Sequence, residues 1–120
     1  MNKVVGSIVI FLLSCSAEPL LKGFNSEKWQ GDELGCNNQR LELVDEIKNR
    51  KAELVGLSEN EISSILGKPN RHELYSRNKK AYVYYIKGGP DCSEKMDNPK
   101  KLVIRFNGVG LSKEIILYKK

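Results

Sequence analysis

The residues of this chain best suited to chemistry are three cysteines, Cys15, Cys36 and Cys92. A thiol can be acylated, oxidised to a disulfide or bound to a metal, and its surroundings decide which reaction occurs. Metal binding fits poorly, because Cys36 and Cys92 with His72, the only histidine, make an incomplete ligand set. The sequence therefore predicts no metal site and no cofactor.

Cys15 follows a short apolar segment at the start of the chain. Residues 1–14 carry one charge, Lys3, and residues 4–13 are mostly Val, Ile, Leu and Phe. This run is too short for a membrane-spanning helix, which takes about 20 apolar residues, and is typical of a secretory signal. Its end, "LLSC", looks like a bacterial lipobox, in which the signal is removed before an acylated cysteine. The alternative, Cys15 in a core helix, lacks an amphipathic pattern beyond the cysteine.

The lipobox predicts how the chain is divided and where it works. We expect a signal peptide over residues 1–14, a lipidated tether over 15–23 and one domain over 24–120. The acyl chains (palmitate) on Cys15 would anchor the protein to the cell envelope. Ser16 lacks the aspartate associated with inner-membrane retention, so the outer membrane, facing the periplasm, is expected. In a host with one membrane, the protein would lie on its outer face.

With Cys15 acylated, Cys36 and Cys92 remain as a pair in an oxidising compartment. A disulfide is the favoured state of such a pair. It would close a loop of just over fifty residues and contribute about 4 kcal/mol by the chain-entropy argument.

Motifs for catalysis are missing from the sequence. It contains no G-x-S-x-G, no H-E-x-x-H and no phosphate-binding glycine loop. His72 is expected in a solvated turn, and Ser63 and Ser64 in ordinary helix positions. The sequence thus predicts a protein that is not an enzyme.

The charge of the chain is only mildly basic. Its formal net charge of +5 falls to +4 without the signal, which carries Lys3. An exported protein seldom meets nucleic acid, so anionic lipid headgroups, an acidic protein face or plain solvation explain the charge better. A basic strip is expected beside the strand starts, and it could contact headgroups or block edge-to-edge aggregation. It consists of Lys79, Lys80, Lys100 and Lys101.

Two helices are predicted from apolar spacing and end signals. The first lies within residues 37–55, with apolar residues at helical spacing, and ends before Gly56. The second covers residues 59–66. Ser58 and Glu61 form a capping box before it, and Gly67 and Pro69 stop it.

Three strands follow, over residues 80–87, 100–106 and 111–120, because β-branched and aromatic residues dominate there. Residues 107–110 form a hairpin turn. The order predicts an α+β fold: two helices packed on one face of a three-stranded antiparallel sheet (ααβββ), with the other face open. Since the first strand is apolar on both faces, its pattern does not decide which face is covered.

Several aromatic residues are candidate contacts for a protein partner. Core packing is the alternative explanation for each of them. The candidates are Trp29, Tyr82, Tyr84, Tyr85 and Tyr118.

Three segments, "VGLSENEISSILGKPN", "AYVYY" and "LVIRFNGVGLSKEIIL", resemble the SmpA/OmlA family, also called BamE-like, over about residues 54–118. The resemblance implies a small ααβββ lipoprotein domain. In the best-known branch it serves as an accessory subunit of the outer-membrane β-barrel assembly machine and contacts partner subunits and anionic lipid. The cysteine pair and residues 24–36 depart from that branch.

Two functions follow as hypotheses. The first is a lipid-anchored, non-catalytic scaffold or accessory subunit with an envelope protein partner, in outer-membrane protein assembly or envelope integrity. The second is a binding module or protein inhibitor that captures a secreted ligand or enzyme. Protein inhibitors of β-lactamase type share the architecture, so fold alone does not choose between these functions.

Overall fold

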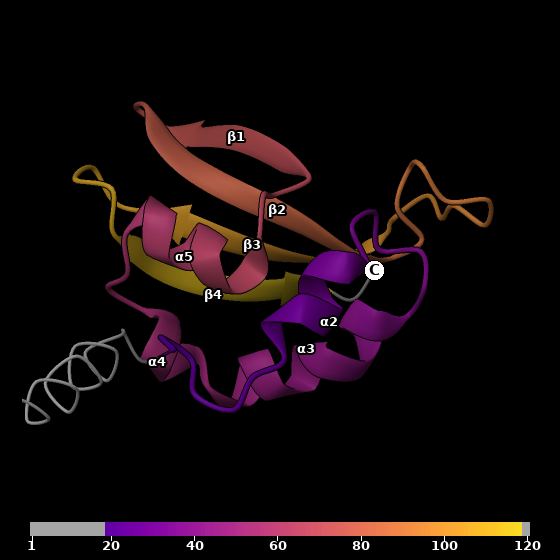
Figure 1. Ribbon diagram of the computed structural model, residues 1–120. Helices are drawn as coiled ribbons and strands as arrows, with labels where there is room; N and C mark the ends of the chain where they lie inside the picture. Colours follow the sequence, from indigo (N-terminus) through magenta and orange to yellow (C-terminus); the bar gives the residue numbers. More distant parts are fainter. Residues whose placement is uncertain (1–18, 119–120) are drawn as a thin grey trace, which may run out of the picture.

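The computed structural model describes residues 19–118. The predicted signal, Cys15 and the first residues of the tether lie outside this range. Within these residues four helices precede four strands, and the strands form one antiparallel sheet in the order β1-β2-β3-β4. All four helices lie on the same side of the sheet (Figure 1), so the domain has two layers and one uncovered sheet face. The elements are α2 (Ser26–Gly31), α3 (Gln39–Asn49), α4 (Lys51–Leu54), α5 (Glu59–Leu66), β1 (Arg71–Ser76), β2 (Lys79–Lys87), β3 (Lys100–Phe106) and β4 (Ser112–Tyr118).

The predicted α+β class is confirmed, but the sheet has four strands where three were expected. The additional strand is β1, which pairs with β2 in antiparallel register. A turn of two residues, Arg77 and Asn78, joins the two strands, and both residues have positive φ, 36° and 68°. Such a turn matches the twist of a hairpin. His72 therefore lies in a strand, and its predicted position in a turn is wrong.

Helix α5 has the predicted bounds and the predicted cap. The Glu61 backbone N–H donates to the Ser58 hydroxyl at 3.1 Å, and the Ser58 N–H donates to the Glu61 carboxylate at 2.9 Å. Gly67 ends the helix with φ 78°, a conformation that costs little only for glycine. The helix is thus fixed at both ends by local chemistry.

The first predicted helix is split in two at Arg50. This residue leaves the helical region, with φ −117° and ψ 27°, between α3 and α4. Its guanidinium bridges Glu46 and Glu53, each at 2.8 Å, across the break. A further helix, α2, was not predicted. It is capped by Asn25, whose side chain accepts from the Lys28 N–H.

The three predicted strands are present as β2, β3 and β4. The core lies between the helices and the sheet face that carries Tyr82, Tyr84, Ile104 and Phe106, all buried. We call this face the covered face and the other the open face. The register pairs Glu73 with Ala81, Ala81 with Arg105 and Arg105 with Glu114, so one row across the open face carries three charged residues.

Candidate functional site

Four of the five aromatic residues predicted as contacts are buried, three of them in the core and Tyr85 on the open face, in a small cluster with Ala81, Val83 and Val103. Trp29 and Tyr84 are 0% exposed, Tyr82 is 5% and Tyr85 is 7%. Burial removes these four from direct contact with a partner, because a contact residue must present surface. Tyr118, 37% exposed, remains.

The rings on the covered face hold the helices to the sheet. The Tyr82 hydroxyl donates to the Glu59 carboxylate at 3.0 Å, and the Tyr84 hydroxyl donates to the Gly67 carbonyl at 2.8 Å. Burial raises the pKa of both hydroxyls. His72 packs edge-on against Tyr82 at 4.9 Å between ring centroids. These contacts account for Tyr82, Tyr84 and His72 as structural residues.

A buried charged pair of residues, Asp32 and Arg40, stabilises the start of α3. Each is 1% exposed. The Asp32 carboxylate accepts from three backbone N–H groups at 2.9 to 3.1 Å, including that of Arg40, and so satisfies donors that the first turn of a helix leaves free.

The Arg40 guanidinium lies within the core. It donates to the carbonyls of Trp29 and Tyr85 and to the Asn70 side chain, at 2.8 to 3.2 Å. It also faces the rings of Trp29 and Tyr84, at 5.2 and 5.7 Å. Burial lowers the pKa of Arg40, while the charge of Asp32 opposes that effect. The sequence does not single out this residue, although Arg40 precedes Val44 and Ile47 at helical spacing on the buried face.

The structure joins Cys36 and Cys92 in a disulfide, with their Cα atoms 5.4 Å apart. The bond links the segment between α2 and α3 to the connection between β2 and β3. Both sulfur atoms lie near the Leu34 carbonyl oxygen, at 3.8 and 3.9 Å. The cross-link ties the helical layer to one end of the sheet.

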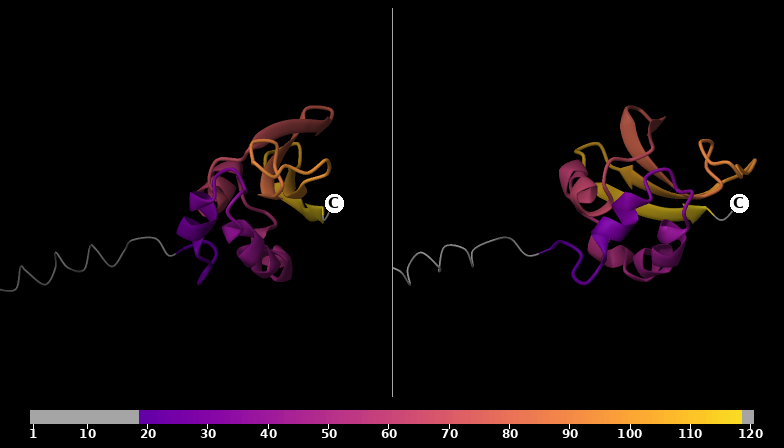
Figure 2. Two further views of the ribbon diagram at one scale, coloured as in Figure 1. Left: turned by 90° about the vertical axis from the view of Figure 1, so that its right-hand side faces the viewer. Right: turned by 45° about the vertical axis from the view of Figure 1, so that its right-hand side comes forward.

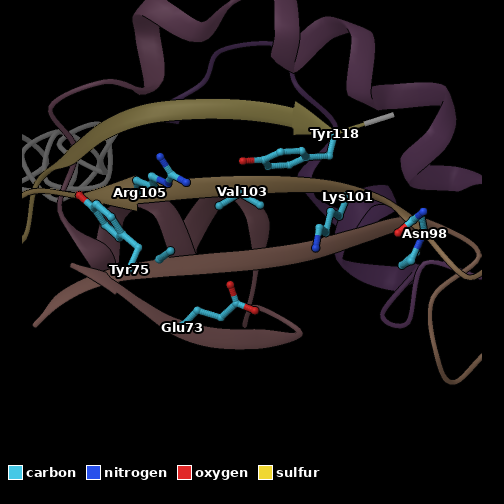
Figure 3. A pocket seen from close by; sticks show the side chains of 9 residues that line it. Glu73, Tyr75, Asn98, Lys101, Val103, Arg105 and Tyr118 are labelled. Atoms are coloured by element: carbon cyan, nitrogen blue, oxygen red, sulfur yellow. The ribbon is translucent and has the colours of Figure 1, made fainter. Parts of the chain in front are cut away.

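The open face of the sheet carries a shallow hollow of about 330 Å³. Figure 3 shows its residues projecting from neighbouring strands. Ala81 and Val103 form its floor and are 2% and 6% exposed. We call this surface the open-face hollow. Its lining residues are Glu73, Tyr75, Ala81, Asn98, Pro99, Lys101, Val103, Arg105 and Tyr118.

Each end of the open-face hollow has one aromatic ring and one cation. The Arg105 guanidinium lies 5.0 Å from the centroid of the Tyr75 ring, and the Lys101 ammonium lies 5.8 Å from that of Tyr118. The Tyr75 hydroxyl donates to the Phe106 carbonyl at 2.6 Å, which fixes its ring. Flat rings beside cations over an apolar floor suit contact with a protein that carries acidic and apolar groups.

The two cations differ in how they are paired. Arg105 forms a salt bridge with Glu114 at 3.4 Å, whereas Lys101 has none with any residue between 19 and 118. Lys101 thus offers the charge that a partner's carboxylate can engage without breaking a bridge of the folded domain.

The expected basic strip does not form one surface. Strands β2 and β3 are antiparallel, so their first residues lie at opposite ends of the sheet. Lys79 and Lys80 lie at one end, where Lys80 reaches Glu59 at 3.4 Å. Lys100 and Lys101 lie at the other end, beside Lys87 and Tyr85. The prediction of a strip is wrong because it took no account of strand direction.

Other kinds of site are not found in the described part of the chain. Between residues 19 and 118, no group of three or more histidine, cysteine or acidic residues could hold a metal ion. None of the helices in that range has the length and apolar composition needed to cross a membrane.

Comparisons with known proteins identify one family. Its model, described as the outer membrane protein assembly factor BamE domain, matches residues 44–116, more than half of the chain. Comparisons with curated proteins and with solved structures found no match. The matched range contains all four strands up to Ile116 but neither α2 nor Arg40. Trp29, Asp32 and Cys36 also lie before it.

Proposed function

The chain belongs to the BamE domain family, and from this premise we propose that it is a lipid-anchored accessory subunit in outer-membrane protein assembly. Members of the family are non-catalytic accessory proteins, which agrees with the missing catalytic motifs. In the proposed arrangement, Cys15 carries the membrane anchor and the folded domain binds another envelope protein. The comparisons give no support to the alternative of an inhibitor.

The observation that carries this proposal is the open-face hollow. The helices cover only one face of the sheet, and the other presents an apolar floor between two aromatic–cation pairs. Interfaces that form between folded proteins have this composition, with apolar and aromatic residues at the centre and charges around them. A partner would bury Tyr75 and Tyr118, which are still partly exposed, and pair an acidic group with Lys101.

A charge reversal in the open-face hollow tests the proposal. The variant Lys101→Glu should weaken co-purification of the lipidated protein with the β-barrel assembly machine from native membranes. The matched control is Lys113→Glu, which makes the same change at an exposed lysine of β4 that does not line the hollow. The amount of folded outer-membrane barrels, measured by heat-modifiable migration on gels, should fall with Lys101→Glu and not with Lys113→Glu.

Two results would contradict the proposal. One is a protein that never co-purifies with the assembly machine from native membranes. The other is equal loss of binding in the Lys101→Glu and Lys113→Glu variants, since a general effect of charge would then replace a specific surface. Thermal unfolding of both purified variants shows whether the domain itself is intact.

A further inference from the structure

The described chain begins with a segment that is docked on the domain. Leu21 is 2% exposed and Phe24 is 8% exposed, and both belong to the principal core. The Phe24 N–H donates to the Leu21 carbonyl at 3.2 Å, and the Phe24 ring packs on Trp29 with centroids 6.1 Å apart. We call residues 19–24 the stem. Because two of its side chains are buried, the stem has a fixed position on the domain, although the sequence places most of it in the tether.

The stem lies on the helical side of the molecule. Together with Ser26 of α2 and with Ser64 and Ile65 of α5, its residues line a mainly apolar hollow of about 320 Å³. Leu20, at the start of the stem, is 44% exposed. In the left view of Figure 2, the indigo start of the described chain lies beside the helices, and the strands lie on their far side.

The distance from the stem to the anchor is short. Three residues lie between Cys15 and Pro19, and the four residue steps from one to the other span at most about 14 Å of fully extended chain. The domain is thicker than that, because a helix with its side chains measures about 10 Å and a sheet layer adds about 10 Å. An acylated Cys15 therefore cannot reach around the domain to bring the open face onto the bilayer.

We propose that the stem sets the orientation of the domain on the membrane. The surface around Leu20 and the stem hollow rests on the phospholipid bilayer, and the open-face hollow points away from it. This inference rests on the lipid anchor of the proposed function. In this orientation the helical side contacts lipid, and Lys101 and Arg105 are available to contact a protein and not lipid headgroups.

Amine footprinting of the lipidated protein in phospholipid vesicles tests the orientation. A water-soluble acylating reagent should modify Lys22, an exposed residue of the stem, several-fold more slowly on vesicles than in a lipid-free form of the same domain. The rate at Lys101, on the open face, should be the same in both forms. Peptide mass spectrometry reads out each lysine separately.

Lengthening the tether provides the second variant. A flexible Gly-Ser insertion of about ten residues between Ser16 and Ala17 adds up to about 35 Å of reach. It should abolish the difference between Lys22 and Lys101 without changing the domain. The matched control places the same insertion between Glu94 and Lys95, in the connection between β2 and β3, where the tether length does not change.

The outcomes separate this inference from the proposed function. A protein that does not sediment with vesicles lacks the anchor, and the proposed function then fails with it. A protein that sediments but shows Lys101 as protected as Lys22 keeps its anchor and overturns the orientation alone. Protection at Lys22 that survives the tether insertion also overturns the inference, because the short reach of the tether would then not set the orientation.

Discussion

The two faces of the sheet use the same kinds of residue for different purposes. On the covered face, Tyr82 and Tyr84 are buried and their hydroxyls are bonded to Glu59 and Gly67. On the open face, the rings of Tyr75 and Tyr118 lie beside cations. Aromatic residues thus close the core on one side of the sheet and form an accessible surface on the other. The role of each ring depends on whether a helix packs against it.

The strand that distinguishes the faces is β3. In β2 both faces are apolar, with six consecutive buried residues. In β3 Lys101 and Arg105 alternate with Leu102, Ile104 and Phe106, so charges mark the open face. The periodicity of β3, combined with the register, is what assigns the two faces.

The largest effect is expected on the covered side. The variant Trp29→Ala should destabilise the domain by about 3 to 5 kcal/mol, since a fully buried indole leaves a cavity and Arg40 loses a ring to pack on. The measurement is urea unfolding. Trp29→Phe should cost less, because the indole N–H has no hydrogen-bond partner among the described residues, so its loss leaves no acceptor unpaired.

The matched open-face change is Tyr118→Ala, which should alter stability by no more than about 0.5 kcal/mol. Similar losses from Trp29→Ala and Tyr118→Ala would show that the open face belongs to the core, and the comparison between the faces would fail.

A smaller effect is expected at a single hydroxyl of the covered face. Tyr84→Phe removes the hydrogen bond to the Gly67 carbonyl and should cost about 1 kcal/mol at neutral pH. Burial raises the pKa of Tyr84, so above about pH 10 the unfolded chain releases a proton that the folded domain keeps. The free energy of unfolding must then fall with rising pH, by up to about 1.4 kcal/mol per pH unit for one such group.

Urea unfolding at a series of alkaline pH values checks this sign. The decline should be shallower in Tyr84→Phe than in the natural protein, and part of it should remain, because burial also raises the pKa of Tyr82. An unchanged slope in Tyr84→Phe would mean that this hydroxyl is not buried in solution.

The parts of the fold that the sequence predicts have local causes. Helix α5 follows from the capping box of Ser58 and Glu61 and from Gly67, all within ten residues. Strands β2 to β4 follow from dense β-branched and aromatic residues. Strand β1 (RHELYS) was missed because its residues are exposed or half-buried and include no β-branched residue, whereas the other edge strand, β4, contains two isoleucines. A strand with so little buried surface does not need alternating apolar residues, so the pattern that predicts strands is missing from β1.

The site depends on contacts that are distant in sequence. Arg40 is buried because Trp29, Asn70 and Tyr85 come together around it. No local sequence pattern predicts this arrangement. The open-face hollow likewise requires the register of all four strands. Composition identified Tyr118 as a candidate, but only the fold shows that Lys101 lies beside it.

A small effect that depends on salt is expected at Arg105. Its guanidinium lies over the Tyr75 ring and bridges Glu114, but both charged side chains are partly solvated, at 33% and 47% exposure. Water and salt screen such a pair, so Arg105→Gln should cost less than about 1 kcal/mol in low salt and still less at high ionic strength. Arg105→Lys keeps the charge but loses the planar group that lies on the Tyr75 ring. It should therefore keep only the salt-sensitive part of the stabilisation that Arg105→Gln removes. A cost near that of Trp29→Ala, insensitive to salt, would instead make Arg105 a buried structural residue like Arg40, and the charge of the open face would then serve stability and not binding.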